Sequence, residues 1–328
     1  MIKNVDLLHD LTETELTFLS DYLTKKIYSP GEVILHQGTS YSDLYIIESG
    51  EVSVSVILPG NTTIEATRLT SGQIFGEVAF LAHTLITATI AAVGTVECIV
   101  FYGKILNMLR IAYPETAYKI ELAIAKQTNS KLTGNLVRIK ELLRTIPVKY
   151  RTVSQHAQYL PDPTAMVEEV EATSINRELI KHMDFFLELT EDETTYLLSF
   201  MSACKYDKGY RFNTKNAPGK LGLICSGAIM LFITDGQKLL KSLAVSGVGE
   251  LFMQNFLSQE FGLIATYVTC EKSITLELTV ENYMRLRECN PYIFYAISQH
   301  IHGTIAGSLY IVNRQFVRMN SEYKDLLA

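Results

Sequence analysis

The chain has 328 residues, of which 48% are hydrophobic and 20% are charged. This length favours two domains, and the composition is that of a protein with buried cores and excludes a disordered chain. The formal net charge of −6 argues against a general nucleic-acid-binding surface.

The sequence predicts neither a secretory signal nor a membrane span. Charged residues interrupt the apolar positions of the first segment, MIKNVDLLHDLTETEL, and no run of 18 apolar residues occurs. The five cysteines are scattered and form no C-x-x-C pair, so we expect reduced thiols and no metal site: Cys98, Cys204, Cys225, Cys270 and Cys289. We therefore expect a cytoplasmic protein.

The first predicted element is a helix that begins after Thr12. Thr12 and Glu15 have the S/T-x-x-E spacing of a capping box, in which each side chain bonds the other residue's backbone. Leu16, Leu19 and Leu23 then follow at helical spacing.

Short strands separated by turn glycines follow this helix. Val33-Ile34-Leu35 and Leu44-Tyr45-Ile46-Ile47 lie between Gly31, Gly38 and Gly50, and further strands are expected at 52–56, 64–67, 88–90 and 98–101. Closely spaced short strands broken by glycine predict an antiparallel β-roll.

Two helices are predicted to close this region, at 103–112 and 114–145. Pro114 fits the first turn of the second helix and favours a break at the residue before it. This helix has an apolar stripe at Leu132, Leu136, Ile139 and Leu143. The stripe could pack on its own domain or, because the helix is long, form a seam with a partner protein or a second copy.

The order of elements repeats in the second half of the chain. The Leu-Thr-Glu segment at 11–13 recurs at 189–191, and Gly31 recurs as Gly209. Three dipeptides also recur: Ser49-Gly50 as Ser226-Gly227, Gly76-Glu77 as Gly249-Glu250, and Tyr113-Pro114 as Asn290-Pro291. The offsets are 178, 178, 177, 173 and 177 residues. Landmarks in one order at nearly one spacing indicate two copies of one structural unit.

The repeat predicts a first domain over 1–146, a connector over 147–174 and a second domain over 175–328. The connector contains Pro147, Pro161 and Pro163, and a short helix at 175–184 leads into the second copy. Helices at 280–288 and 291–319 are expected to close that copy. The predicted fold class is α+β, with two antiparallel, jelly-roll-like β-rolls, each flanked by helices, and long C-terminal helices.

The landmarks of the first copy resemble the cyclic-nucleotide-binding domain of kinase regulatory subunits and catabolite-activator-type regulators. They include Pro30-Gly31-Glu32, the segment Leu44 to Gly50, and Gly72-Gln73-Ile74-Phe75-Gly76-Glu77. The second copy keeps fewer landmarks, at Lys208-Gly209, 223–227 and 249–251.

The resemblance implies a phosphate-binding cassette that starts at Gly76, with Glu77 accepting a hydrogen bond from a ribose hydroxyl. The ligand-binding residues implied are Gly76, Glu77, Val78, Ala79, Ile86, Thr87 and Ala88. Ile86 stands where the family has an arginine that neutralises the phosphate. Losing that contact is expected to weaken cyclic-nucleotide binding by roughly 30- to 1,000-fold.

The second pocket is expected to be degenerate. The resemblance places it at Gly249, Glu250, Leu251, Ile264, Ala265 and Thr266, with Ile264 at the arginine position.

No nucleophile elbow, P-loop or metal-ligand cluster occurs, so we expect no enzymatic activity, no catalytic residue and no cofactor. We also expect no DNA binding, since no helix-turn-helix module follows the long helices. Two hypotheses remain. One is a regulatory sensor that binds a cyclic nucleotide, cAMP or cGMP, or a related small ligand in the first roll and transmits the change through its helices. The other is a protein-interaction or dimerisation scaffold whose rolls have lost nucleotide binding.

Overall fold

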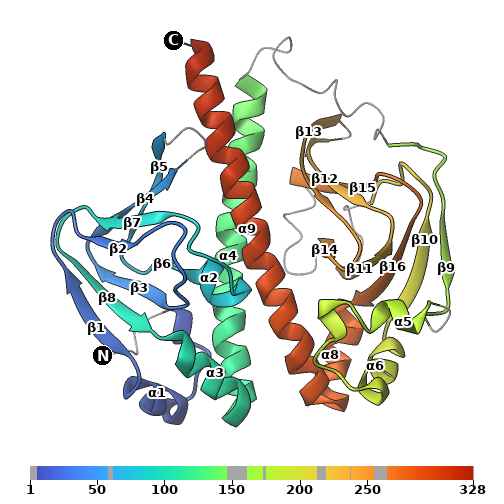
Figure 1. The fold of residues 1–328 in the computed structure, drawn as a ribbon, viewed down its shortest axis with the longest axis horizontal. Helices are drawn as coiled ribbons and strands as arrows, with labels where there is room; N and C mark the ends of the chain where they lie inside the picture. The colour runs from blue at the N-terminus through green and yellow to red at the C-terminus, as the bar shows by residue number, and fades with distance from the viewer. Residues whose placement is uncertain are drawn as a thin grey trace. The chain divides into compact units, whose positions relative to one another are not determined.

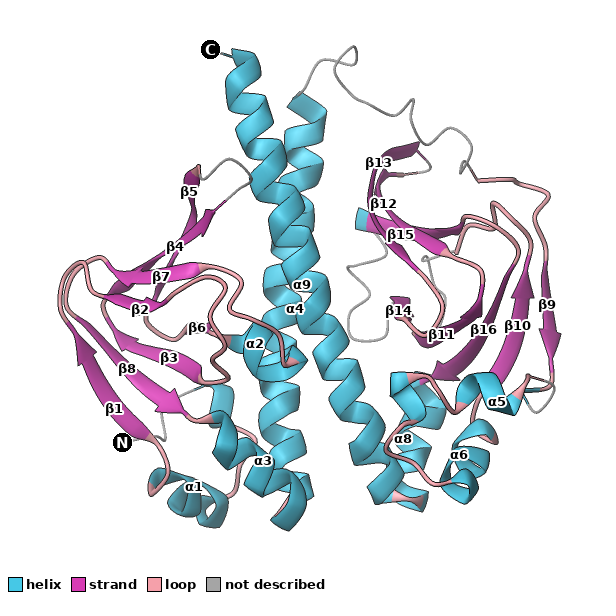
Figure 2. Ribbon diagram, viewed as in Figure 1, coloured by secondary structure: helices cyan, strands magenta, loops and turns pink. Residues whose placement is uncertain are grey.

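The computed structural model of the chain describes residues 6–57, 62–145, 161–172, 175–212, 219–236, 238–254 and 264–327. It confirms the predicted α+β fold class, with two antiparallel β-rolls flanked by helices (Figures 1 and 2).

The first roll consists of two four-stranded sheets, and every strand pair in them is antiparallel. Its strands are β1 (Thr24–Tyr28), β2 (Val33–Leu35), β3 (Leu44–Ser49), β4 (Glu51–Ile57), β5 (Thr63–Thr70), β6 (Ile74–Phe75), β7 (Thr89–Ala92) and β8 (Val96–Phe101). One sheet has the order β1-β8-β3-β6 and the other has the order β2-β7-β4-β5. Their facing sides enclose one apolar core, to which Tyr28, Tyr45, Ile86, Ile90 and Val100 belong.

The helices of this half begin and end where the local signals indicate. They are the 3₁₀ turn Asp6–Leu8, α1 (Glu13–Ser20), α2 (Glu77–Ala82), α3 (Gly103–Ala112) and α4 (Pro114–Thr145). Thr12 and Glu15 form the predicted capping box. Tyr113 leaves helical geometry with φ −141°, and this confirms the predicted break before Pro114.

The second roll repeats this plan with a further edge strand. Its strands are β9 (Val167–Val170), β10 (Ser202–Tyr206), β11 (Lys220–Ser226), β12 (Ile229–Asp235), β13 (Lys238–Ser246), β14 (Leu251–Gln254), β15 (Ala265–Thr269) and β16 (Ser273–Thr279). The sheets have the orders β14-β11-β16-β10-β9 and β13-β12-β15. Thr190 and Glu193 form the second capping box, as predicted.

Helices surround this second roll as well. They are α5 (Arg177–Ile180), the 3₁₀ turn Asp184–Phe186, α6 (Glu191–Leu198), α8 (Val280–Cys289) and α9 (Pro291–Leu327). The helix predicted at 175–184 is thus two short pieces, and α9 continues eight residues beyond its predicted end at residue 319.

Part of the predicted connector is regular structure. Val167–Val170 forms β9, which pairs antiparallel with β10 through partners such as Ala203 and Val170. The pattern Val-Glu-Glu-Val suits an edge strand, where one side of the backbone is paired and the charged side chains reach water. Residues 146–160 of the connector lie outside the described part of the chain.

Contacts divide the chain into two compact units that differ from the predicted domain boundaries. One unit contains residues 1–131 and 299–326, and the other contains 132–298. The difference arises because α4 and α9, with 32 and 37 residues, each contribute to both units. Leu132, Leu136, Ile139 and Leu143 of the predicted stripe are all buried within the single chain.

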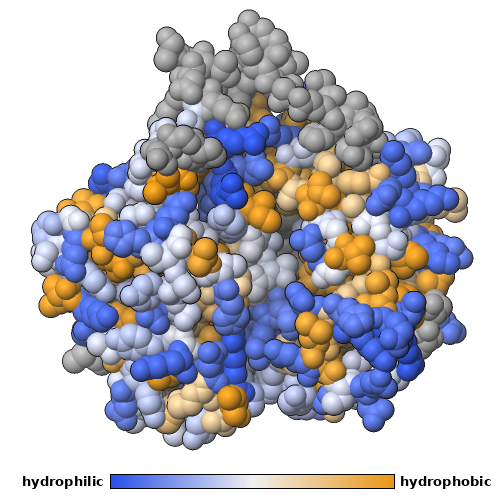
Figure 3. All heavy atoms as spheres, viewed as in Figure 1, coloured by the Kyte–Doolittle hydropathy of each residue, from blue (hydrophilic) through white to orange (hydrophobic). Residues whose placement is uncertain are grey.

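On the face shown in Figure 3, hydrophobic residues are dispersed among hydrophilic ones and do not gather in one large area. Among the described helices, none has the length and apolar character that a membrane crossing requires.

Candidate functional site

The cassette predicted at Gly76 starts with a sharp turn between β6 and α2. Gly76 has φ +85°, and a Cβ there would lie 2.5 Å from the carbonyl oxygen of Asp43. Glycine is therefore required both by the backbone conformation and by the close approach of β3. The turn delivers the short helix α2, whose first residue is Glu77.

Glu77 is buried and forms an ion pair with a residue that the sequence analysis missed. Lys131 of α4 donates to Glu77 Oε1 at 2.7 Å and to the carbonyl oxygen of Ile74 at 2.6 Å. The side chain of Glu77 is 8% exposed and that of Lys131 is 23% exposed. Lys131 thus supplies a counter-charge to a carboxylate that the cassette sequence alone leaves without one.

The second carboxylate oxygen of Glu77, Oε2, differs from Oε1 in its hydrogen bonding. Among the described residues, no hydrogen-bond donor reaches Oε2, and the side chain as a whole is 8% exposed. An ionised carboxylate can accept several hydrogen bonds. Oε2 can therefore accept a hydrogen bond from a hydroxyl or amine of a ligand.

Ile86 lies in the apolar core of the first roll. It is 5% exposed and belongs to the same buried cluster as Ala79, Tyr45 and Phe75. Its backbone is fixed, since its N–H donates to the carbonyl oxygen of Thr39 at 2.9 Å and its carbonyl oxygen accepts from Gly38 at 2.8 Å. The position at which the resemblance implies an arginine therefore holds a buried aliphatic side chain.

The other predicted residues of this pocket flank these two. Val78 and Ala79 are buried on α2, while Thr87 and Ala88 are partly buried on the segment that enters β7. The structure therefore places the predicted set on two consecutive segments of the first roll, α2 and the stretch from Ile86 to β7. Phe80, on the same helix, contacts Phe101 with ring centroids 5.5 Å apart.

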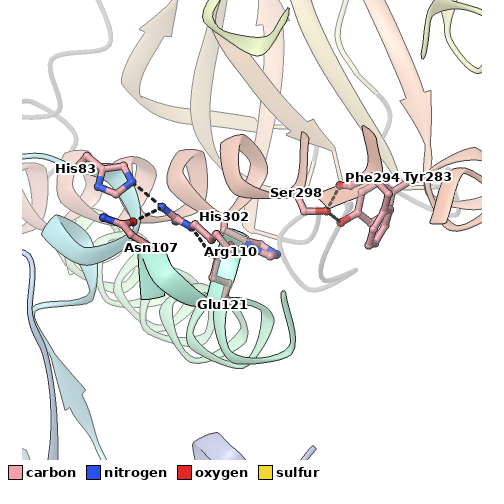
Figure 4. A network of polar contacts seen from close by, with 8 residues as sticks. All are labelled: His83, Asn107, Arg110, Glu121, Tyr283, Phe294, Ser298 and His302. Carbon is pink, nitrogen blue, oxygen red and sulfur yellow. Dashed lines mark hydrogen bonds and ion pairs between the residues drawn. The ribbon is translucent and has the colours of Figure 1, made fainter. Parts of the chain in front are cut away.

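A chain of polar contacts leads from the end of α2 to three other helices (Figure 4). His83 caps α2 in the left-handed conformation, with φ +51°, and its Nε2 accepts from Arg110 Nη1 at 3.2 Å. Arg110 Nε donates to Glu121 Oε1 at 2.7 Å, and His302 Nδ1 donates to Glu121 Oε2 at 3.3 Å. We call these four residues the relay. They connect α2 with α3, α4 and α9.

The centre of the relay is deeply buried. The side chains of Glu121 and His302 are each 2% exposed, and that of Arg110 is 13% exposed. Burial raises the pKa of the Glu121 carboxyl, but the hydrogen bond from His302 and the charge of Arg110 outweigh it and lower the pKa below its ordinary value. Glu121 is therefore an ionised group inside the protein, held by two donors.

Helix α9 also touches α2 directly. A Cβ at Gly303 would lie 3.2 Å from the carbonyl oxygen of Leu81 and 3.7 Å from Cα of Ala82. The absence of a side chain at Gly303 therefore permits the close approach of α9 to the end of α2. His302 is the preceding residue of α9, so the relay and this backbone contact lie together.

The hydrogen bonds of the second roll correct the register of the predicted second pocket. The Gly249 N–H donates to the carbonyl oxygen of Ile224, as the Gly72 N–H does to Ile47. Leu251 pairs with Leu223 as Ile74 pairs with Ile46. Gly249 and Glu250 therefore correspond to Gly72 and Gln73, at an offset of 177 residues, and not to Gly76 and Glu77.

The same offset moves the rest of the predicted second pocket. At this offset Gln254 takes the sequence position of Glu77. In β15, Thr269 pairs with Ile229 as Ala92 pairs with Val52. Ala265 and Thr266 therefore match Ala88 and Thr89, Ile264 matches Thr87, and the counterpart of Ile86 is residue 263, which lies outside the described residues. The predicted offset of 173 arose because the first copy contains Gly followed by an acid or amide at two nearby places, Gly72-Gln73 and Gly76-Glu77.

The interior of the second roll contains a polar cluster where the first roll is apolar. Glu277 pairs with Gly222 as Val100 pairs with Tyr45, so Glu277 stands at the position of Val100. Its carboxylate is 2% exposed and accepts from Tyr206, from Lys220 at 2.9 Å and from Thr275 at 3.1 Å. Burial and the nearby Glu277 charge raise the pKa of Tyr206.

Aromatic rings pack beside this cluster. Tyr206 contacts Phe212 with centroids 4.8 Å apart, and Phe212 contacts Phe252, which in turn contacts Tyr267. Elsewhere in the same unit, the hydroxyls of Tyr283 and Ser298 lie 2.7 Å apart in a separate contact that does not touch the relay (Figure 4).

Comparisons with known proteins agree with the first roll. Residues 25–111 match the family model of the cyclic nucleotide-binding domain. A cAMP-dependent protein kinase type II regulatory subunit of Drosophila melanogaster is 35% identical over 101 residues, 31% of this chain and 26% of that protein. A cAMP-dependent protein kinase regulatory subunit of Yarrowia lipolytica is 36% identical over 91 residues, 28% of this chain and 24% of that protein. The chain thus spans about a quarter of the length of these relatives.

The similarity to solved structures is lower. The regulatory domain of Toxoplasma gondii PKA with cAMP is 14% identical and covers 89% of this chain and 90% of its own, with a TM-score of 0.31. A cyclic nucleotide-binding domain from Methylobacillus flagellatus is 19% identical, covers 44% and 81%, and has a TM-score of 0.40. The matched residues 25–111 contain the cassette start, Ile86 and the relay residues His83 and Arg110. Residues 25–111, which include most of the first roll, are thus similar to cyclic nucleotide-binding domains.

Proposed function

We propose that this protein is a non-enzymatic cytoplasmic regulator whose first roll senses a cyclic nucleotide, cAMP or cGMP, or a related small ligand. The observation that carries this proposal is the Glu77 carboxylate at the cassette start, which is buried, pairs with Lys131 through Oε1 and has no donor at Oε2 among the described residues. Keeping a carboxylate buried is costly unless it is paired, and such an acceptor oxygen suits a ligand hydroxyl.

The relay supports transmission from the cassette to the helices. Both ends of α2 are tied to helices outside the roll, by Glu77 to Lys131 of α4 and by His83 to Arg110 of α3. Through Glu121, Arg110 also connects to His302 of α9. A ligand that shifts α2 must therefore alter contacts of α3, α4 and α9, and these helices would carry the change to a protein partner.

Binding is tested by isothermal titration calorimetry with cAMP, cGMP and their parent nucleosides up to millimolar concentration. Glu77→Gln should weaken any binding by about tenfold, since a hydrogen bond to a charged acceptor becomes one to a neutral amide. Glu65→Gln is a matched control, because Glu65 is exposed on β5 and pairs with Arg68. Equal affinities for Glu77→Gln and wild type would place the ligand elsewhere.

Transmission is tested by hydrogen–deuterium exchange with and without the bound ligand. Protection should change in α3 and in α9 around His302, and Arg110→Gln should reduce the change in α9. A ligand response confined to the roll would contradict the proposed route.

A second candidate function is a protein-interaction or dimerisation scaffold. Two observations favour it, namely the buried Ile86 in the first roll and the interior of the second roll, which is filled by aromatic rings and the Glu277 cluster. The two candidate functions predict different results in the titration described above. The absence of heat and of a thermal shift with every nucleotide and nucleoside at millimolar concentration would favour the scaffold. A homodimer through the long helices is a further part of this candidate, and sedimentation equilibrium tests it.

A further inference from the structure

The first roll combines an acceptor for ligand hydroxyls with an apolar side chain at the phosphate position. We propose that its ligand is an uncharged ribonucleoside, and that Ile86 makes the site select the nucleoside over the nucleoside's phosphate esters. This inference rests on the proposed function, since it assumes that the first roll binds a nucleotide-like ligand.

The cassette has no cation available for a phosphate. From Gly76 to Ala92 the sequence contains one charged side chain, Glu77, and no lysine or arginine. Among the described residues, Lys131 and Arg110 contact this segment, and each forms an ion pair with a carboxylate. Lys131 pairs with Glu77 at 2.7 Å, and Arg110 pairs with the buried Glu121 at 2.7 Å.

The missing cation affects the phosphate in particular, because Ile86 lies where the resemblance implies the phosphate contact. Its side chain belongs to the buried apolar cluster that includes Tyr45, Phe75 and Ala79, and its backbone is hydrogen-bonded to residues 38 and 39. A phosphate at this place would lose its water against methyl groups and gain no charged partner. Loss of a charge-assisted hydrogen bond corresponds to roughly 30- to 1,000-fold in affinity.

The Glu77–Lys131 pair, in contrast, suits an uncharged ligand. The pair is neutral overall, so a neutral ligand encounters no net charge when it approaches. Oε2 of Glu77 can accept from a ribose hydroxyl, whereas it has no hydrogen to donate to an anion. The two halves of the site thus both favour a hydroxyl-bearing, uncharged ligand.

The test compares wild-type protein against matched ligands by calorimetry, using adenosine and cAMP, guanosine and cGMP, and the 2′-deoxynucleosides. The better nucleoside should bind at least 30-fold more tightly than its cyclic phosphate. The corresponding 2′-deoxynucleoside should bind about tenfold more weakly than the nucleoside, since it lacks the hydroxyl that donates to Glu77. Equal or tighter binding of the cyclic phosphate would overturn this inference and leave the proposed function standing.

Variants of Ile86 and Glu77 test whether these two residues cause the preference for the nucleoside. Ile86→Arg should raise the affinity for the cyclic phosphate at least tenfold and leave the nucleoside affinity unchanged or lower. The thermal unfolding of this variant is measured first. If it does not fold, the inference is judged on the ratio of nucleoside to cyclic-phosphate affinity in the wild type and on the Glu77→Gln variant. Glu77→Gln should lose about tenfold for the nucleoside and much less for the 2′-deoxynucleoside, whereas Glu65→Gln should match wild type. An unaltered nucleoside affinity in Glu77→Gln would overturn the inference, and no binding of either class would overturn the proposed function as well.

Discussion

The Glu121 carboxylate is the centre of the relay, and its replacement by glutamine should destabilise the protein by about 2–3 kcal/mol. Removing one partner of a buried ion pair costs roughly 3–5 kcal/mol, because the remaining charge stays buried. Arg110 would keep its hydrogen bonds to Asn107 and His83, and its side chain is 13% exposed. These contacts recover part of the loss, so the expected value lies below that range.

The measurement is urea denaturation followed by far-ultraviolet circular dichroism, because the chain has no tryptophan for fluorescence. Glu65→Gln removes the same charge from an exposed pair with Arg68, whose side chains are 45% and 49% exposed. That control should change the free energy of unfolding by about 0.5 kcal/mol or less.

The pH dependence gives an independent check. The pKa of Glu121 is lowered in the folded protein, so its contribution is complete above the ordinary value of 4.5 and is lost as pH falls through the folded-state pKa. The stability difference between Glu121→Gln and wild type should therefore shrink in acid. A difference below about 0.5 kcal/mol at neutral pH, equal to that of the control, would refute the view that this pair is buried and energetically coupled.

Three further predictions follow from separate contacts. Glu15→Gln keeps the capping-box spacing but replaces the charged acceptor of Thr12, Thr116 and Lys119 by a neutral amide, so it should destabilise by about 1–2 kcal/mol. Although burial opposes it, hydrogen bonds led by the Thr12 backbone lower the pKa of Glu15 to about 2, so the effect should persist above pH 4.5 and vanish as pH falls toward 2, and a pH-independent difference would contradict this. Gly303→Val should push α9 away from α2 and raise hydrogen exchange in both helices, and unchanged protection would show that the approach is not tight. Lys220→Met should destabilise by about 1–3 kcal/mol in urea by leaving Glu277 without its counter-ion, and a neutral effect would mean that the remaining hydrogen-bond donors suffice.

Local signals predicted the elements that depend on neighbours in the chain. The Thr12 and Thr190 capping boxes connect residues three apart, and both form as predicted. The break at Tyr113 follows from the proline after it. The resemblance placed Gly76 at the cassette start, and the structure adds that the turn there has a left-handed backbone. These features are properties of short segments, so the sequence contains them completely.

The partners of the site residues depend on long-range packing and were not predictable. Glu77 and Lys131 are 54 residues apart, and Glu121 and His302 are 181 apart. Nothing in either segment indicates that the helices meet there, and the sequence therefore left Glu77 without a counter-charge. The register of the second pocket was wrong for a different reason, since the neighbouring offsets of 177 residues already pair Gly249 with Gly72, and the ladder hydrogen bonds agree with that pairing.

The sequence alone determined the two rolls, their capped helices and the replacement of the phosphate-binding arginine by Ile86, because each of these is encoded by local pattern or residue identity. The tertiary structure decided what those residues face. It placed Ile86 in the core, Lys131 on Glu77 and α9 against α2, because the packing of helices distant in sequence determines which charges are paired and which positions remain open to a ligand.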